Sequence, residues 1–179
     1  ITVYGLRYTD YGIRITVYGL RYTNHTYQGL LNVMGQQHVL KVRGRYSNIR
    51  QICDFVIHGA QTSGLGEGAT FHIELACDEA CTNIIEHAYE GEDRGDIEVR
   101  WRVKGNDFVI TFHDNGRSFD PTTVPAPAIS ELSETPEPEN LRVGGLGIHF
   151  MRTLMDDIRY SFDQQKGNTL TMIKQIGGE

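Results

Sequence analysis

The stretch Glu79-Ala80-Cys81-Thr82-Asn83-Ile84-Ile85-Glu86-His87 lies within a longer segment, 67–89, whose periodicity predicts a helix. At roughly 100° per residue, Glu79, Asn83 and His87 fall on one narrow stripe of that helix. A separate apolar arc, suited to face a core, comprises Ile73, Cys77, Ala80, Ile84 and Ala88. A carboxylate and a carboxamide one turn apart beside this surface are costly to bury without partners. Hydrated Mg²⁺ with nucleotide phosphates would be such a partner; a solvent-facing stripe is the alternative.

Length and composition indicate one globular domain, or one domain with an appendage. The chain has 179 residues, of which 39% are hydrophobic and 22% charged. Its net charge of −6 repels nucleic acid and anionic membranes, so we expect neither as a direct partner. No run of about 20 apolar residues predicts a membrane span, and the first residues lack the layout of a signal peptide. We therefore expect a cytoplasmic protein.

The cysteines give no strong sign of a metal site. There are three, Cys53, Cys77 and Cys81, and an odd, sparse set favours a reducing compartment. Cys77 and Cys81 are one helical turn apart, which could provide half of a metal site, but no second pair follows at suitable spacing. Small buried thiols are the better interpretation.

Residues 1–28 form four heptads, and the nonapeptide at 1–9 recurs at 15–23. Six of the nine tyrosines lie in this segment. Because Gly, Thr, Val and Tyr are poor helix formers, the heptads predict short strands more than a coiled coil. We interpret 1–28 as an N-terminal arm that docks on a sheet edge, or as a leader without activity, and 29–179 as the functional domain.

The remaining pattern predicts an α+β fold. Strands are expected at 38–43, at 97–103 and 108–113 around a tight turn, and in a hairpin formed by 158–162 and 169–173. Helices are expected at 49–60, at 67–89 and after Gly147. This order gives a two-layer sandwich, with the helices on one face of a mostly antiparallel mixed sheet.

Between the strand ending at His113 and the glycines at 144–147, the composition changes. All five prolines of the chain lie within 121–138, together with several glutamates and no Lys or Arg. Such a segment is extended, and long loops inside a domain are usually lids or binding loops. We expect a lid over about 117–147, with a passive linker as the alternative.

Two further motifs carry chemistry. Asp114-Asn115-Gly116 follows directly from a strand, where the Asp can accept the exocyclic amine of adenine and Gly116 lets the ring approach the backbone. Gly144-Gly145-Leu146-Gly147-Ile148 opens a helix, whose N-terminus favours phosphate. Each motif alone is weak: the first is more often a tight turn, and the second is neither a Walker A loop nor a full dinucleotide fingerprint.

Together, the three motifs resemble the GHKL ATPase superfamily over roughly residues 38–174. Within it, the segments 78–89, 114–121 and 144–148 are most similar to the anti-sigma-factor serine kinases of bacterial partner-switching systems. Glu86 stands where histidine kinases commonly carry a Lys, and the sequence before 78 shows no phosphoacceptor hairpin. Both features count against a two-component histidine kinase.

The resemblance implies a role for each matching residue. Asn83 would bind the Mg²⁺ that bridges the ATP phosphates, and Glu79 would be the general base that takes the proton from a protein serine. Asp114 would hold the adenine amine, with Gly116 beneath the ring and Thr169 supporting the pocket. The glycine-rich stretch of the lid, which would also bind ATP, comprises Gly144, Gly145, Leu146, Gly147 and Ile148. His87 has no catalytic role in this scheme.

The function implied is an anti-sigma factor that binds Mg-ATP and phosphorylates a serine of a small antagonist protein, with partner switching controlled by nucleotide state. Its partners would be that antagonist and a sigma factor, and the family suggests a homodimer. Two alternatives stay open: a module that sequesters a partner in an ATP-dependent manner without phosphorylating it, and a plain ATPase whose glutamate activates water.

Overall fold

The two alternating apolar runs at the centre of the sequence pair with each other as the middle of a sheet. The structure is a computed structural model that describes residues 36–118, 146–163 and 165–177. In it, β2 (Asp96–Lys104) and β3 (Asp107–Asp114) are antiparallel, with Val103 opposite Phe108. Every second residue of β2 is buried, as expected for a strand with one face on a core; these are Ile97, Val99, Trp101 and Val103.

Three further strands complete a five-stranded sheet in the order β1-β2-β3-β5-β4. β1 (His38–Arg43) pairs with β2, β5 (Gly167–Gln175) pairs with β3, and β4 (Asp157–Asp163) pairs with β5. Each of these pairs is antiparallel, so the described sheet contains no parallel pair and is more regular than the mostly antiparallel mixed sheet predicted from the sequence.

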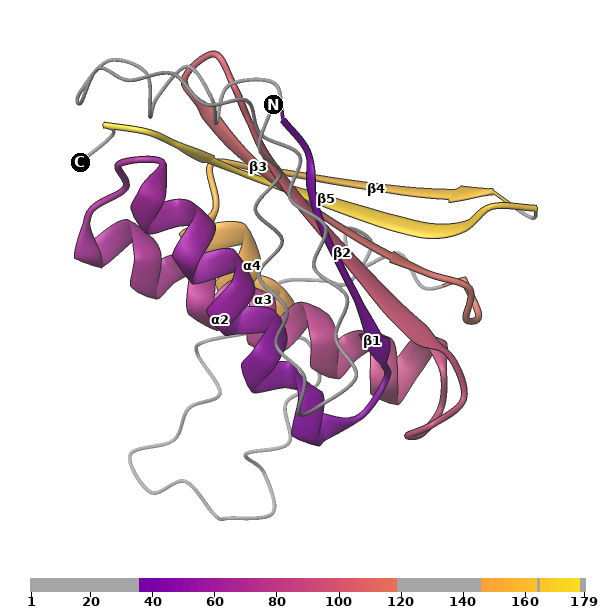
Figure 1. The fold of residues 1–179 in the computed structure, drawn as a ribbon. Coiled ribbons are helices and arrows are strands. Elements are labelled where there is room, and N and C mark those ends of the chain that lie inside the picture. The colour runs from indigo at the N-terminus through magenta and orange to yellow at the C-terminus, as the bar shows by residue number, and fades with distance from the viewer. Residues whose placement is uncertain (1–35, 119–145, 164, 178–179) are drawn as a thin grey trace, which may run out of the picture.

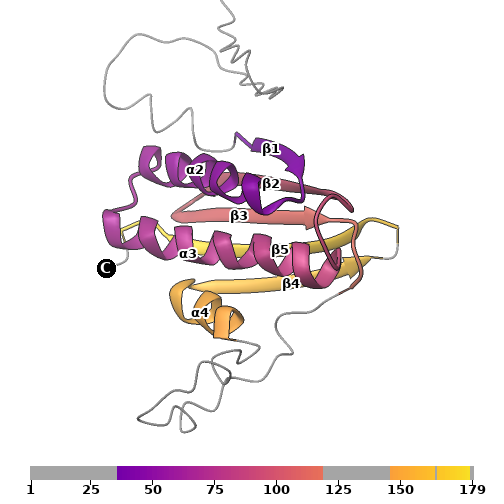
Figure 2. The same cartoon turned by 90° about the horizontal axis from the view of Figure 1, so that it is seen from below.

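The helices lie together on one face of this sheet (Figure 1). They are α2 (Tyr46–Thr62), α3 (Glu67–Asn83), with η1 (Ile84–Ala88) continuing from it, and α4 (Leu146–Leu154). In Figure 2 they run side by side, with α3 between α2 and α4 and across the centre of the sheet. The predicted α+β two-layer fold is confirmed.

The long helix predicted over 67–89 is not a regular α-helix throughout. Its last turn, η1, is a π-helix, in which the Tyr89 backbone N–H donates to the carbonyl of Ile84, five residues earlier, at 2.8 Å. A π turn holds one more residue than an α turn, so side chains after Asn83 leave the stripe that the α-helical period predicts. His87 is accordingly exposed, whereas Glu79 and Asn83 are half-buried.

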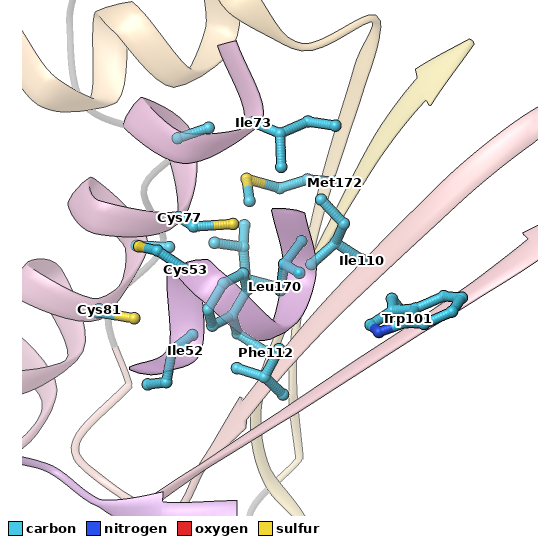
Figure 3. Close-up of a cluster of buried hydrophobic side chains, with 14 of the residues drawn as sticks. Ile52, Cys53, Ile73, Cys77, Cys81, Trp101, Ile110, Phe112, Leu170 and Met172 are labelled. Atoms are coloured by element: carbon cyan, nitrogen blue, oxygen red, sulfur yellow. The ribbon is translucent and has the colours of Figure 1, made fainter. Parts of the chain in front are cut away.

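The core lies between the helical layer and the sheet, where α2 and α3 meet the apolar faces of β3 and β5 (Figure 3). Cys53, Cys77 and Cys81 are all buried there as free thiols, which confirms the interpretation of them as small core residues. Burial raises the pKa of Cys53 to about 12. Within the described residues, no group of three or more His, Cys, Asp or Glu is placed to hold a metal ion.

Two of the predicted segments fall largely or wholly outside the described residues. They are the arm at 1–28 and most of the lid at 117–147, including Gly144 and Gly145. Among the helices of the described ranges, none is both long enough and apolar enough to cross a membrane.

Candidate active site

A pocket lies between the helices and the sheet, at the end of the sheet where β3 stops. Its apolar lining comes from α3, η1, α4 and β5, namely Ala80, Ile84, Ala88, Met151 and Leu170. Four polar side chains join them: Asn83, Asp114, Tyr160 and Asn168. An apolar cavity with a few convergent polar groups is the usual form of a small-molecule site.

Asp114 is the acidic residue that lines the pocket. It is the last residue of β3 and is 5% exposed. Burial raises the pKa of its carboxyl group, and hydrogen bonds from Asn168 and Gly116 oppose that rise. Both bonds, each 2.8 Å long, end on Oδ1: one comes from Nδ2 of Asn168 and the other from the backbone N–H of Gly116. No hydrogen bond from the described residues reaches Oδ2, so this oxygen is available to accept one from a ligand in the pocket.

The segment after Asp114 is held against the end of η1. The Arg117 backbone N–H donates to the carbonyl of Ala88 at 2.8 Å, and the Arg117 guanidinium pairs with Glu90 at 2.6 Å. Gly116 packs so closely that a Cβ on it would lie 2.6 Å from the Ala88 carbonyl oxygen. This backbone contact therefore requires a glycine at 116, a residue that does not itself line the pocket.

We expect Gly116→Ala to lower the free energy of unfolding by about 1–3 kcal/mol, the usual cost of forcing a methyl group into a filled space. Urea unfolding followed by circular dichroism measures the effect. Gly68→Ala is the matched control, since nothing lies within 4 Å of a Cβ at that position in the first turn of α3. There alanine should be neutral or stabilising by up to about 1 kcal/mol. Equal stability of wild type and Gly116→Ala would contradict the packing described.

Glu79 and Asn83 stand one turn apart on α3. Burial raises the pKa of the Glu79 carboxyl group, and the negative charges of Asp78 and Glu86 raise it further. Asn83 lines the pocket, and its Nδ2 atom is buried with no hydrogen-bond partner in the described part of the chain. A buried amide nitrogen without a protein partner is an incomplete polar group, which a ligand can complete.

The first turn of α4 brings Gly147 against Glu79. A Cβ at position 147 would overlap the Glu79 carboxylate, so a larger residue there would require that side chain to move aside. The other end of α4 is fixed by Lys174 of β5, whose ammonium donates to the Leu154 carbonyl at 2.9 Å. The acid of α3 thus lies beside the N-terminal end of a helix whose position is set by the sheet.

The structure brings some of the described candidate residues together, but not all. Asn83 and Asp114 share the pocket, while Ile148 is buried in the core. Thr169 lies on the opposite face of the sheet from the helices, where its Oγ1 is 3.4 Å from Nδ1 of His113.

The residue that supports Asp114 is Asn168, which the sequence analysis did not select. It is 3% exposed and is paired with Asp114 across β3 and β5. A signal for it was present: Asn168, Leu170 and Met172 alternate, and the last two are apolar, so period-2 counting places Asn168 on the buried face.

Residues 42–174 match a known family described as the histidine kinase-like ATPase domain. The chain belongs to this family. The GHKL-type fold and the family predicted from the three motifs are thereby confirmed, since the match spans all the described helices and almost all of the sheet.

Relatives of this histidine kinase-like ATPase domain include several bacterial proteins named serine-protein kinase RsbW. The one from Listeria monocytogenes serotype 4a (strain HCC23) is 34% identical over 117 residues, which cover 65% of this chain and 73% of the relative. Those from Bacillus subtilis (strain 168) and Bacillus licheniformis are 34% and 35% identical; in both cases, 60% of this chain and 65% of the relative are covered.

Proposed function

We propose that this chain is a protein-serine kinase that uses ATP, and that it acts as an anti-sigma factor whose substrate is a serine of a small antagonist protein. The observation that carries the proposal is the half-buried acid Glu79, which stands on α3 one turn before the pocket residue Asn83, in a relative of proteins named serine-protein kinase. Phosphoryl transfer to a hydroxyl requires positioned phosphates and a carboxylate that orients the nucleophile.

In this proposal each polar group of the site has one task. Asp114 accepts the exocyclic amine of adenine on Oδ2, and Asn168 rather than Thr169 supports it from β5. Glu79 takes the proton of the serine hydroxyl. The segment 144–148 closes over the phosphates, with Gly147 giving the close approach to Glu79.

The residues present fit a magnesium ion. Asn83 lines the pocket, and no hydrogen bond to its buried Nδ2 atom fixes the orientation of the amide, so its oxygen can be turned toward a cation. Mg²⁺ binds few protein oxygens and completes its shell with phosphates and water. When bound, the ion would neutralise charge on the phosphates.

The proposal also includes a sigma factor as a second partner, a homodimer, a lid over about 117–147 and a cytoplasmic location, all as the family resemblance implies. Net charge of −6 supports protein partners over nucleic acid.

The direct test is transfer of labelled phosphate. The chain is incubated with Mg-ATP labelled at the γ-phosphate and with a small protein encoded beside it, and the product is mapped by mass spectrometry. We expect label on one serine of the small protein. ATP-sensitive association without transfer would instead indicate the sequestering module, and phosphate release without any protein partner would indicate a plain ATPase.

The raised pKa of Glu79 predicts where the kinase activity falls on the acidic side of its pH profile. A general base works when ionised, so turnover is full above its pKa and falls as pH drops through it. Because burial and the charges of Asp78 and Glu86 raise that pKa, the fall should begin at a higher pH than for an ordinary glutamate. The measurement is kcat against pH at saturating ATP. Glu86→Gln removes one of the neighbouring charges and should move this fall to lower pH; a fall at the unchanged pH would argue against Glu79 as the base.

A further inference from the structure

Tyr160, Asn168 and Asp114 form a polar triad in the pocket, joined by hydrogen bonds across β4, β5 and β3. The Tyr160 hydroxyl donates to Oδ1 of Asn168 at 2.6 Å, and Nδ2 of Asn168 donates to Oδ1 of Asp114 at 2.8 Å. Asn168 is 3% exposed and Asp114 5% exposed, so the bond between them is shielded from water, while the bond from Tyr160 is partly buried.

The surroundings of Asn168 allow only one orientation of its amide. Nδ2 faces three oxygens: Oδ1 of Asp114, the Arg117 carbonyl at 3.0 Å and the Gly116 carbonyl at 3.3 Å. If the amide were flipped, its oxygen would face all three acceptors and its nitrogen would face the tyrosine hydroxyl. The Tyr160 hydroxyl, by donating to the amide oxygen, therefore favours the orientation in which the amide nitrogen donates to the other three groups.

This orientation of the Asn168 amide determines which oxygen of Asp114 is left to accept a hydrogen bond from a ligand. Oδ1 receives hydrogens from Asn168 and from the backbone of Gly116, and Oδ2 is left for the ligand. An ionised carboxylate only accepts hydrogen bonds. Adenine presents an amine donor at its 6-position, whereas guanine presents a carbonyl acceptor there. A carboxylate facing the 6-position therefore attracts adenine and repels the carbonyl of guanine.

We propose that Tyr160 and Asn168 are positioning residues that make the pocket selective for adenine over guanine by holding Asp114 as an acceptor. This rests on the proposed function, because it requires a nucleotide base in this pocket. Tyr160 also lines the pocket, but the role proposed for its hydroxyl runs through Asn168: without the hydroxyl, the buried amide oxygen loses this donor, and the amide is no longer held in the orientation that Asp114 needs.

The test is binding of three nucleoside diphosphates by calorimetry, with no catalysis involved: ADP, GDP, and the diphosphate of purine riboside, which lacks the amine. The wild type should prefer ADP to both others. In Tyr160→Phe we expect ADP to bind about 5- to 10-fold more weakly, the size of one hydrogen bond. The advantage of ADP over the amine-free ligand should shrink by the same factor. Tyr46→Phe is the control, since the Tyr46 hydroxyl bonds to Glu86 instead.

The results distinguish a failure of the proposed function from a failure of the role given to Tyr160. If the wild type binds no ADP, the proposed function fails. If the wild type prefers ADP but Tyr160→Phe weakens the binding of all three ligands equally, or changes the binding of none, the role given to Tyr160 is wrong.

Asn168→Asp is the second variant: it keeps the shape of the side chain but replaces the donor NH₂ group by a carboxylate oxygen facing Asp114. We expect it to lose the preference for ADP over GDP, and a retained preference in the folded variant would also overturn the proposal.

Discussion

Replacing Glu79 by Gln is expected to slow phosphate transfer to the antagonist serine by about 10²- to 10⁴-fold, the range that a positioned general base contributes. Glutamine has the same size and hydrogen-bonds similarly, so the contact with Gly147 should persist. It has no basic oxygen that can take the serine proton. ADP affinity should therefore stay within a few-fold of wild type. Single-turnover transfer of label and calorimetry with ADP measure the two quantities separately.

The matched control for this substitution is Asp78→Asn. Asp78 is the neighbouring acid on α3, but it is exposed, whereas Glu79 is half-buried beside α4. Near neutral pH, the Asp78→Asn protein should transfer phosphate at a rate close to wild type. Normal labelling by a Glu79→Gln protein would remove Glu79 from the mechanism, and the base would have to be sought elsewhere.

Asp114→Asn is expected to weaken ADP binding by about 10- to 100-fold and to raise the relative affinity for GDP. In the wild type, Asn168 and the Gly116 N–H both donate to one oxygen of Asp114. An asparagine at 114 must turn its single oxygen toward these donors, so its NH₂ group faces the base. Two donors then meet at the adenine amine, whereas the carbonyl of guanine would gain a donor.

Calorimetry with ADP and GDP on the same protein preparation measures this change in preference. Asp107→Asn is a suitable control, because Asp107 begins the same strand that Asp114 ends and does not line the pocket. If Asp114→Asn bound ADP as tightly as the wild type, the adenine would not be recognised at this carboxylate.

The sequence predicted well those parts of the fold that depend on local periodicity. The alternation in 97–103 and 108–113 identified β2 and β3, and with them the position of Asp114 at the end of a strand. The stripe through Glu79 and Asn83 was visible because α3 keeps its α-helical period up to Asn83. The three motifs were informative together because, in this order, they indicated the family that the match over residues 42–174 confirms.

The parts that were missed depend on contacts between segments. The π turn of η1 was not predicted, since the apolar spacing of Ile84, Ile85 and Ala88 is also compatible with an α-helix. Asn168 was passed over for Thr169. Its alternation with Leu170 places it on the buried face, but its position opposite Asp114 depends on the register of β3 with β5, which is a tertiary property. The tight contact of Gly116 with Ala88 likewise joins residues 28 positions apart, so it has no local signal.

Because all three cysteines are buried, their reactivity can report how often the helical layer separates from the sheet. No thiol is accessible to an alkylating reagent while α2 and α3 are packed on the sheet. A thiol is then modified only in molecules in which these helices have separated from the sheet. When the helices repack faster than the reagent reacts, the alkylation rate reports the free energy of this opening. Comparing alkylation rates with and without nucleotide would therefore reveal how strongly a ligand clamps the helical layer, in the unaltered polypeptide and without an introduced label.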